Sequence, residues 1–184
     1  MWFSQVYNNE NALEQFLSGG VIVARVHIIC GMICSGKTFF SRGLREKYNG
    51  VILSTDEITL ALPQDAIRDC FDEVSRGVNA YLLEKSVQII NAGVDVILDW
   101  GFWKMSDRKQ ARTFFAQHNV ETVMYYLDTD EQTLAENTAQ RNESVKKGET
   151  SAFYVDERLA EKCRALFEIP AESEIDVRIV NNRY

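Results

Sequence analysis

The sequence predicts a three-layer α/β fold, in which a mostly parallel five-stranded sheet is flanked by helices and carries a small lid. Two observations predict this fold: short β-branched, apolar runs recur along the chain, and stretches with helical spacing of apolar residues separate them. The composition agrees, because 46% hydrophobic and 26% charged residues among 184 are typical of a globular protein. One domain is expected at residues 21–184, after an N-terminal segment at 1–20.

The first third of the chain gives four elements. A short helix is expected at 11–17, where two glycines end it, and a first strand at 21–30, which is apolar on both faces as in a covered parallel sheet. A helix begins near Gly36 and ends at the turn signal 49–50. A second strand follows at 51–54.

A long helical stretch is predicted at 65–91. Apolar residues at steps of three and four place one face of it against the core: Ile67, Phe71, Val74, Val78 and Tyr81. Gly77 is a candidate position for a bend or a break.

The remaining elements alternate in the same way. They are a strand at 94–99, a basic helix at 104–118, a strand at 120–128, a helix at 130–142, a mobile loop at 146–154, a helix at 155–168 and a fifth strand at 175–180.

Charge and hydropathy limit the function. Twenty basic and 27 acidic residues give a net charge of -7, which disfavours a polynucleotide partner without excluding a local basic groove. No apolar run reaches the ~18 residues of a membrane span, and the N-terminus lacks the features of a secretory signal. A cytoplasmic location is therefore expected.

The four cysteines, at positions 30, 34, 70 and 163, form no CxxC pair and predict neither a zinc site nor a disulfide framework. Cys30 and Cys34 bracket the glycine-rich stretch described next, where oxidation could affect function. Small apolar packing residues are the alternative interpretation.

The stretch "GMICSGKT" fits the pattern G-x-x-x-x-G-K-[ST], between a predicted strand and a predicted helix. It predicts an ATP-binding loop made of Gly31, Met32, Ile33, Cys34, Ser35, Gly36, Lys37 and Thr38. Backbone N–H groups and the helix N-terminus would hold phosphate oxygens. Lys37 would reach the β- and γ-phosphates, and the Thr38 hydroxyl would bind Mg²⁺. The alternative is a glycine turn with a solvated lysine.

Asp56 is a candidate catalytic base. It lies just beyond the second strand, and ligands of parallel sheets bind at the carboxyl ends of the strands. A carboxylate there could accept the proton of an attacking hydroxyl. The alternative is a helix start, because Ser54 and Glu57 fit a capping box.

Asp99 ends the third strand and is a candidate to hold Mg²⁺ through water, or to hold Thr38 or the acceptor. A cap after a strand is the alternative. Trp100, Phe102 and Trp103 follow, and they could stack on an acceptor or pack in the core.

Basic residues form the last candidates. Lys104, Arg108 and Arg112 recur at helical spacing, and Arg108 is a candidate for neutralising transferring phosphates, the alternative being a solvated face. Arg141 has a lid-like position, from which a guanidinium could stabilise the transferred group. His27 and His118 are interpreted as structural.

These residues resemble a known group, the P-loop kinase-like ATP-binding domains of zeta toxins, chloramphenicol phosphotransferase and the kinase domain of polynucleotide kinase. The similar motifs span about residues 25–180: "GMICSGKT", "STDEI", "VILDWGFW…DR", "YYLDTDEQTLAENTAQRN" and "FEIPAESE". The resemblance implies ATP-dependent phosphorylation of a hydroxyl, with Asp56 as base, Arg141 on the phosphates and Pro170 near the adenine. One departure is that the lid has lysines where such lids often carry a second arginine.

The sequence therefore predicts an ATP- and Mg²⁺-dependent phosphotransferase acting on a small-molecule hydroxyl, which the resemblance supports. Its catalytic residues would be Lys37, Asp56, Asp99, Arg108 and Arg141. A guanine-specific switch is disfavoured because no Asn-Lys-x-Asp motif occurs. Two alternatives remain open: a polynucleotide 5′-hydroxyl kinase, and an ATP-binding regulatory or toxin-like module without turnover.

Overall fold

A computed structural model describes residues 23–181 of the chain. The helix predicted at 11–17 and the first two residues of the strand predicted at 21–30 lie outside this range. None of the helices within 23–181 combines the length and the apolar character that crossing a lipid bilayer requires.

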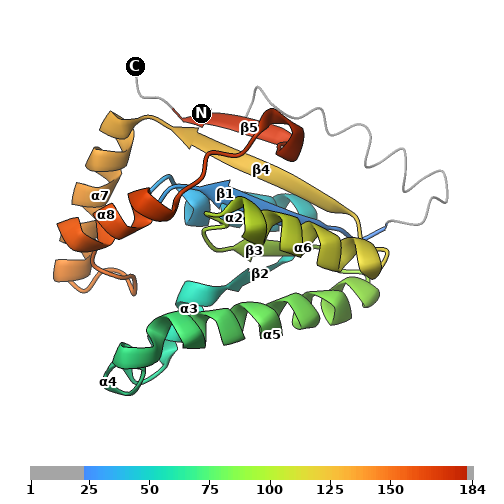
Figure 1. The fold of residues 1–184 in the computed structure, drawn as a ribbon, viewed down its shortest axis with the longest axis horizontal. Coiled ribbons are helices and arrows are strands. Elements are labelled where there is room, and N and C mark those ends of the chain that lie inside the picture. The colour runs from blue at the N-terminus through green and yellow to red at the C-terminus, as the bar shows by residue number, and fades with distance from the viewer. Residues whose placement is uncertain (1–22, 182–184) are drawn as a thin grey trace.

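Five strands form one parallel sheet in the order β2-β3-β1-β4-β5 (Figure 1). They are β1 (Val26–Gly31), β2 (Val51–Ser54), β3 (Val96–Asp99), β4 (Thr122–Thr129) and β5 (Val177–Asn181). The predicted five-stranded sheet is confirmed, and every pairing in it is parallel.

Seven α-helices are described between and around the strands. They are α2 (Lys37–Tyr48), α3 (Thr55–Ala61), α4 (Gln64–Ile67), α5 (Phe71–Asn91), α6 (Met105–Gln117), α7 (Glu131–Lys146) and α8 (Glu157–Leu166), with short 3₁₀ turns η1 (Arg68–Cys70) and η2 (Glu172–Glu174).

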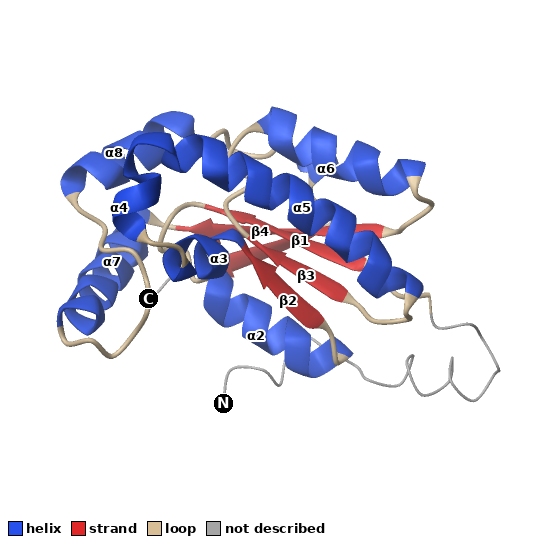
Figure 2. Ribbon diagram, turned by 90° about the horizontal axis from the view of Figure 1, so that it is seen from below, coloured by secondary structure: helices blue, strands red, loops and turns tan. Residues whose placement is uncertain are grey.

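Helices cover both faces of the sheet, so the predicted three layers are confirmed (Figure 2). On one face, residues such as Ile28 pack against Phe115 of α6 and Ile90 of α5. On the other, Ile29 packs with Leu44 of α2. The central strands β1 and β3 are buried along their whole length, which explains why their sequences are apolar without alternation.

The prediction of one continuous helix at 65–91 is wrong. The chain leaves the α-helix after Ile67 and resumes it at Phe71, whereas Gly77 lies inside unbroken α5 with open space where a Cβ would be. The buried stripe of α5 is also shifted, to Leu82, Ser86 and Ile90, and Tyr81 is 59% exposed. Within α5 the stripe continues from Val78 to Leu82, a step of four residues, whereas the prediction took the step of three to Tyr81.

Helix α7 extends to Lys146, four residues beyond its predicted end. Arg141 lies on this helix in both cases, and the loop that follows begins at Lys147.

Candidate active site

The phosphate loop connects β1 to α2 through backbone conformations that few residues adopt. Cys34 and Gly36 have φ values of 63° and 93°, and Gly36 is the N-cap of α2. At Gly31 a Cβ would lie 2.6 Å from Ser35 Oγ, closer than packed atoms allow. Gly31 is thus required because a side chain would clash with Ser35, and Gly36 because its backbone has a positive φ.

The Lys37 ammonium turns back into the loop. It donates to the carbonyls of Gly31 at 2.9 Å and Met32 at 2.7 Å. Burial lowers the pKa of Lys37, and the carboxylates of Asp99 and Asp56 oppose that shift. The cation is thus fixed at the loop with nearby carboxylates favouring its charged form.

Three side chains outside the motif hold the outer carbonyls of the loop. Asn137 of α7 donates to Cys34 O at 3.0 Å, while Thr129 and Asn181 donate to Ser35 O at 3.3 and 3.4 Å. Sequence analysis missed these residues: Thr129 and Asn181 are marked only by their place at the end of a strand, and Asn137, inside α7, has no such signal.

Asp99 lies at the sheet edge where β2 and β3 end together. Its register partner is Ser54, so Asp56 emerges from the neighbouring strand end. Asp99 is 6% exposed, and burial raises the pKa of its carboxyl, against a hydrogen bond with Thr38 and the charge of Lys37. Asp56 raises that pKa further, because like charges disfavour each other.

The Ser54–Glu57 segment begins a helix, as one of the two interpretations predicts. Ser54 is the N-cap of α3, and its side chain accepts from the Glu57 N–H at 3.4 Å. Asp56, in the first turn, takes no part in the cap, and its carboxylate lines the cleft. Partial burial between the cleft walls raises the pKa of Asp56, whereas Arg141 and Lys37 lower it.

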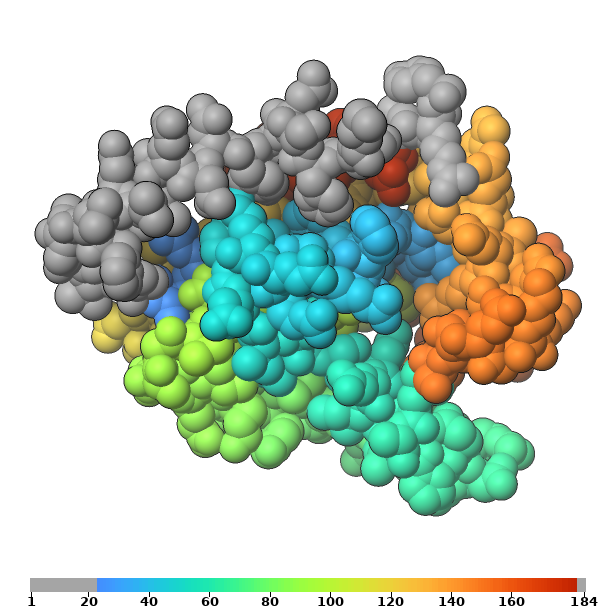
Figure 3. Space-filling model, turned by 180° about the vertical axis from the view of Figure 1, so that it is seen from behind, coloured from blue at the N-terminus to red at the C-terminus, as the bar shows by residue number. Residues whose placement is uncertain are grey.

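A cleft of about 2810 Å³ joins these groups. It opens between the α3–α4 region and the α7–α8 segment, visible as the hollow between teal and orange surfaces in Figure 3. A typical pocket for one small ligand measures roughly 300–1,000 Å³. The cleft therefore has room for a nucleotide and a second compound.

The lid consists of α7, α8 and the connection 147–156. Arg141 Nε donates to Phe153 O at 3.0 Å, and the positive charge of its guanidinium lowers the pKa of Asp56. Next to it, Asn142 exchanges two hydrogen bonds with the backbone of Val155, at 2.7 and 2.8 Å. The segment predicted as a mobile loop, 146–154, is thus tied to α7 at Phe153 and, directly after its end, at Val155.

A family model described as the AAA domain matches residues 26–170. The chain belongs to this AAA domain family. The match begins with β1 and includes the phosphate loop, both carboxylates and Arg141. No curated protein matches the sequence significantly.

The fold of this chain is similar to that of P-loop kinases of known structure, as the resemblance implied. A sugar kinase from Janibacter sp. HTCC2649 is 18% identical with a TM-score of 0.60, covering 86% of this chain and 85% of its own. The APS kinase CysC of Mycobacterium tuberculosis, in complex with AMPPNP and APS, is 15% identical with a TM-score of 0.58, covering 88% and 90%. Kti12 of Chaetomium thermophilum, in complex with ADP-AlF3, is 12% identical with a TM-score of 0.64, covering 85% and 88%.

Thr38 and Asp99 have the side-chain oxygens that a magnesium site requires. Mg²⁺ is commonly held by one or two protein oxygens, with phosphates and waters completing the shell. The Asp99 carboxylate hydrogen-bonds with Thr38, so both oxygens face one point beside Lys37. Within residues 23–181, no group of three or more His, Cys, Asp and Glu side chains forms an all-protein metal site.

Arg108 occupies a different place from the one its predicted catalytic role requires. It is 1% exposed and lies outside the cleft lining. Its Nη1 donates to the carbonyls of Phe102, Trp103 and Glu168 at 3.0–3.1 Å, and Nε and Nη2 reach Glu174 at 2.9 and 3.2 Å. This geometry supports a positioning role, in which Arg108 joins the turn after β3 to the C-terminal segment.

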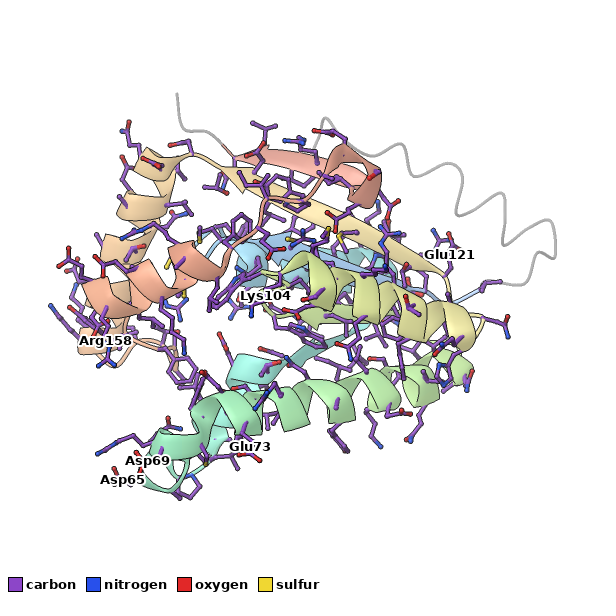
Figure 4. All side chains as sticks on the ribbon, in the orientation of Figure 1. Asp65, Asp69, Glu73, Lys104, Glu121 and Arg158 are labelled. Atoms are coloured by element: carbon purple, nitrogen blue, oxygen red, sulfur yellow. The ribbon has the colours of Figure 1, made fainter. Side chains whose placement is uncertain are left out.

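The other members of the predicted basic face separate in the same way. Arg112 donates to Glu174 O at 2.9 Å and forms an ion pair with Asp176. Lys104 alone lines the cleft, and Figure 4 shows it at the edge of the hollow. Of the three basic residues, Arg108 and Arg112 thus bond to the C-terminal segment, and Lys104 borders the cleft.

The aromatic run also divides between the two interpretations. Phe102 is 4% exposed and stacks on Trp100 with ring centroids 4.9 Å apart. All three residues line the cleft, although Phe102 is almost fully buried, and the Trp103 ring covers Gly101. Pro170 is buried and absent from the cleft lining, so this geometry does not support its expected place near the adenine.

Proposed function

We propose that this AAA domain chain transfers the γ-phosphoryl group of ATP to a hydroxyl of a small molecule, with Mg²⁺ as cofactor. The observation that carries the proposal is the convergence of Lys37, Asp56 and Asp99 in one cleft, which Arg141 also lines from the lid. Nucleotide binding alone does not require a carboxylate at the position of Asp56.

Each residue has one task in this reaction. Asp56 accepts the proton as the acceptor O–H bond breaks. The acceptor oxygen forms a bond to the γ-phosphorus while the bond to the β,γ-bridging oxygen breaks, and ADP leaves with that electron pair. Lys37 and the loop N–H groups hold the phosphates, and Arg141 stabilises charge on the transferred group. Thr38 and Asp99 would hold Mg²⁺, which supplies charge neutralisation at the β- and γ-oxygens.

The test measures ATP consumption and product formation with Mg²⁺ across sugars, nucleosides, nucleotide sugars and aminoglycosides. We expect transfer to at least one compound, and a loss of roughly 10²–10⁴-fold in Asp56→Asn, the range for general-base catalysis, with ATP affinity retained. Glu57→Gln is the matched control, because Glu57 is the adjacent carboxylate in the same helical turn and also lines the cleft. Equal turnover in Asp56→Asn and wild type would refute the role of Asp56.

The non-catalytic alternative has one observation in its favour. The lid lysines cannot replace a second arginine where they lie: Lys146 stands over the Tyr154 ring, and Lys147 pairs with Glu143 at 2.7 Å. Neither lines the cleft. An ATP-binding module of this kind would bind ATP tightly, transfer nothing, and show the same background hydrolysis in Asp56→Asn. A 5′-hydroxyl oligonucleotide in the same screen tests the polynucleotide alternative.

A further inference from the structure

The part of the cleft beyond Asp56 is built by α3, the first two turns of α5 and the turn after β3. Helix α5 contributes its N-terminal side chains: Phe71, Asp72, Ser75, Arg76 and Asn79. Asn79 accepts a hydrogen bond from Thr55, the residue before Asp56. Arg76 precedes Asn79 by three residues, about 4.5 Å along the helix axis. Arg76 therefore lies on the same wall of the cleft, about one turn of α5 before the residue that is bonded to Thr55.

Arg76 has no ion-pair partner within residues 23–181. Its neighbour one turn earlier, Asp72, is engaged with Lys162, whose Nζ lies 3.0 and 3.1 Å from the two carboxylate oxygens. Arg68, the other arginine on this wall, is paired with Asp65. Arg76 is thus the guanidinium on this side of the cleft that no carboxylate engages.

Lys104 supplies a second uncompensated cation from the opposite wall. It is the N-cap of α6, makes no side-chain cap hydrogen bond and forms no ion pair among the described residues. Ser, Thr, Asp and Asn are favoured at this position, and a positive charge there opposes the helix dipole. Helix stability therefore gives no reason for a lysine at this place in the cleft.

The carboxylates of the cleft do not cancel these two charges. Asp56 and Asp99 lie beside Lys37. Glu57 and Asp107 occupy the first turns of α3 and α6, where the helix N-terminus already favours a negative charge. The cations Arg42 and Arg45 belong to α2, which packs on the other face of the sheet.

We infer that the phosphoryl acceptor is an anionic compound, whose phosphate or carboxylate group is bound by Arg76 together with Lys104. The inference rests on the proposed function and specifies its substrate class. A guanidinium forms two parallel hydrogen bonds with either anion, and an ammonium adds a point charge. With the anionic group held by these cations, a hydroxyl on the same molecule would face Asp56.

A binding experiment tests this without requiring turnover. The full chain carrying Trp2→Phe is saturated with AMP-PNP and Mg²⁺, so that the phosphate loop is filled and the emission comes from Trp100 and Trp103, which line the cleft. Matched probes are then titrated: ribose against ribose 5-phosphate, and glucose against gluconate and glucose 6-phosphate. We expect a charged probe to bind at least about tenfold more tightly than its neutral partner, since a charge-assisted hydrogen bond contributes roughly 1.5–3 kcal/mol. Comparing gluconate with the two phosphates shows which anion is preferred.

Variants locate the site. Arg76→Gln and Lys104→Gln should each weaken the charged probe about tenfold or more and leave AMP-PNP affinity unchanged. Arg158→Gln is the matched control, because Arg158 is an exposed arginine outside the cleft lining (Figure 4). Equal binding of charged and neutral probes, or charged-probe binding that survives Arg76→Gln, would overturn the inference while leaving phosphotransfer possible. Failure of AMP-PNP to bind would instead contradict the proposed function.

Discussion

Asp72 of α5 and Lys162 of α8 meet across the mouth of the cleft, with Lys162 Nζ 3.0 and 3.1 Å from the two carboxylate oxygens. Beside them, the rings of Phe71 and Phe153 pack edge to face with centroids 5.6 Å apart. These four residues, which we call the lid latch, connect the lid to the N-terminal end of α5, on the side of the cleft beyond Asp56. The latch joins the start of α5 directly to α8 and to the connection before it, so it contributes to the distance between the lid and Asp56.

Loosening the lid latch should change lid dynamics more than stability. The pair is exposed, at 51% and 74%, so Lys162→Gln should cost less than about 1 kcal/mol of unfolding free energy. In contrast, amide hydrogen exchange at residues 148–154 should become several-fold faster, because the loop loses a contact that holds it over the cleft. Lys85→Gln, which removes an exposed lysine contact elsewhere on the molecule, is the control. Unchanged exchange in Lys162→Gln would show that the latch does not hold the lid.

Replacing Arg108 should lower the free energy of unfolding, because the residue holds the structure together and does not line the cleft. Arg108→Met removes the partner of Glu174 and the donor to three carbonyls, and breaking a buried ion pair typically costs about 3–5 kcal/mol. Denaturant unfolding measures this loss. Arg112→Met is the milder comparison, because Arg112 is 33% exposed. An Arg108→Met protein with wild-type stability but no phosphotransfer would restore the catalytic role that the sequence predicted.

The raised pKa of Asp56 should appear in both activity and stability. A general base must be ionised, so kcat/KM should begin to fall with acid at a higher pH than an ordinary aspartate, of pKa 3.8, would give. Because the folded state holds this proton more tightly than the unfolded state, ionisation costs stability as pH rises from 3.8 through the raised pKa. Asp56→Asn should therefore be more stable than wild type at pH 7, with the advantage disappearing toward pH 4.

Urea unfolding of both proteins at the two pH values measures this difference. Glu57→Gln serves again as the neighbouring carboxylate control. If Asp56→Asn is instead less stable than wild type at pH 7, the ionised carboxylate is a net stabilising partner of Arg141 and Lys37, and its pKa is not raised.

The cysteines should differ sharply in reactivity. Burial raises the pKa of Cys30 and of Cys163 to about 11, so at pH 8 only about one thiol in a thousand is a thiolate. Iodoacetamide should alkylate exposed Cys70 first and leave these two largely unmodified, as peptide mass spectrometry would show. Mg²⁺ with ATP should slow the labelling of Cys34, which lies in the phosphate loop, but not that of Cys70. Rapid alkylation of Cys30 would contradict the packing interpretation.

Local signals predicted the elements that depend on local physics. The strand at 51–54 was correct to the residue, and helix α2 ends at the predicted turn, because Asn49 adopts the left-handed conformation that closes it. The helix predicted at 65–91 failed at η1, where apolar spacing continues through a break in the backbone. The spacing of apolar residues continues through residues 68–70, so it does not reveal that the α-helix is interrupted there.

The sequence by itself determined the phosphate loop, because Gly31, Gly36, Lys37 and Thr38 act through their own backbone and a single strand-to-helix turn. It also determined the parallel sheet, since both faces of its central strands must be apolar to be buried. Only the tertiary structure decided the remaining roles. It buried Arg108 against Glu174, 66 residues away, and brought Arg141 of the lid toward Asp56. It also placed Arg76 and Lys104 in the wall of the same cleft, with no ion-pair partner within residues 23–181. The reason is physical: the charge that a side chain meets depends on which distant segments lie beside it, and spacing along the chain does not specify that arrangement.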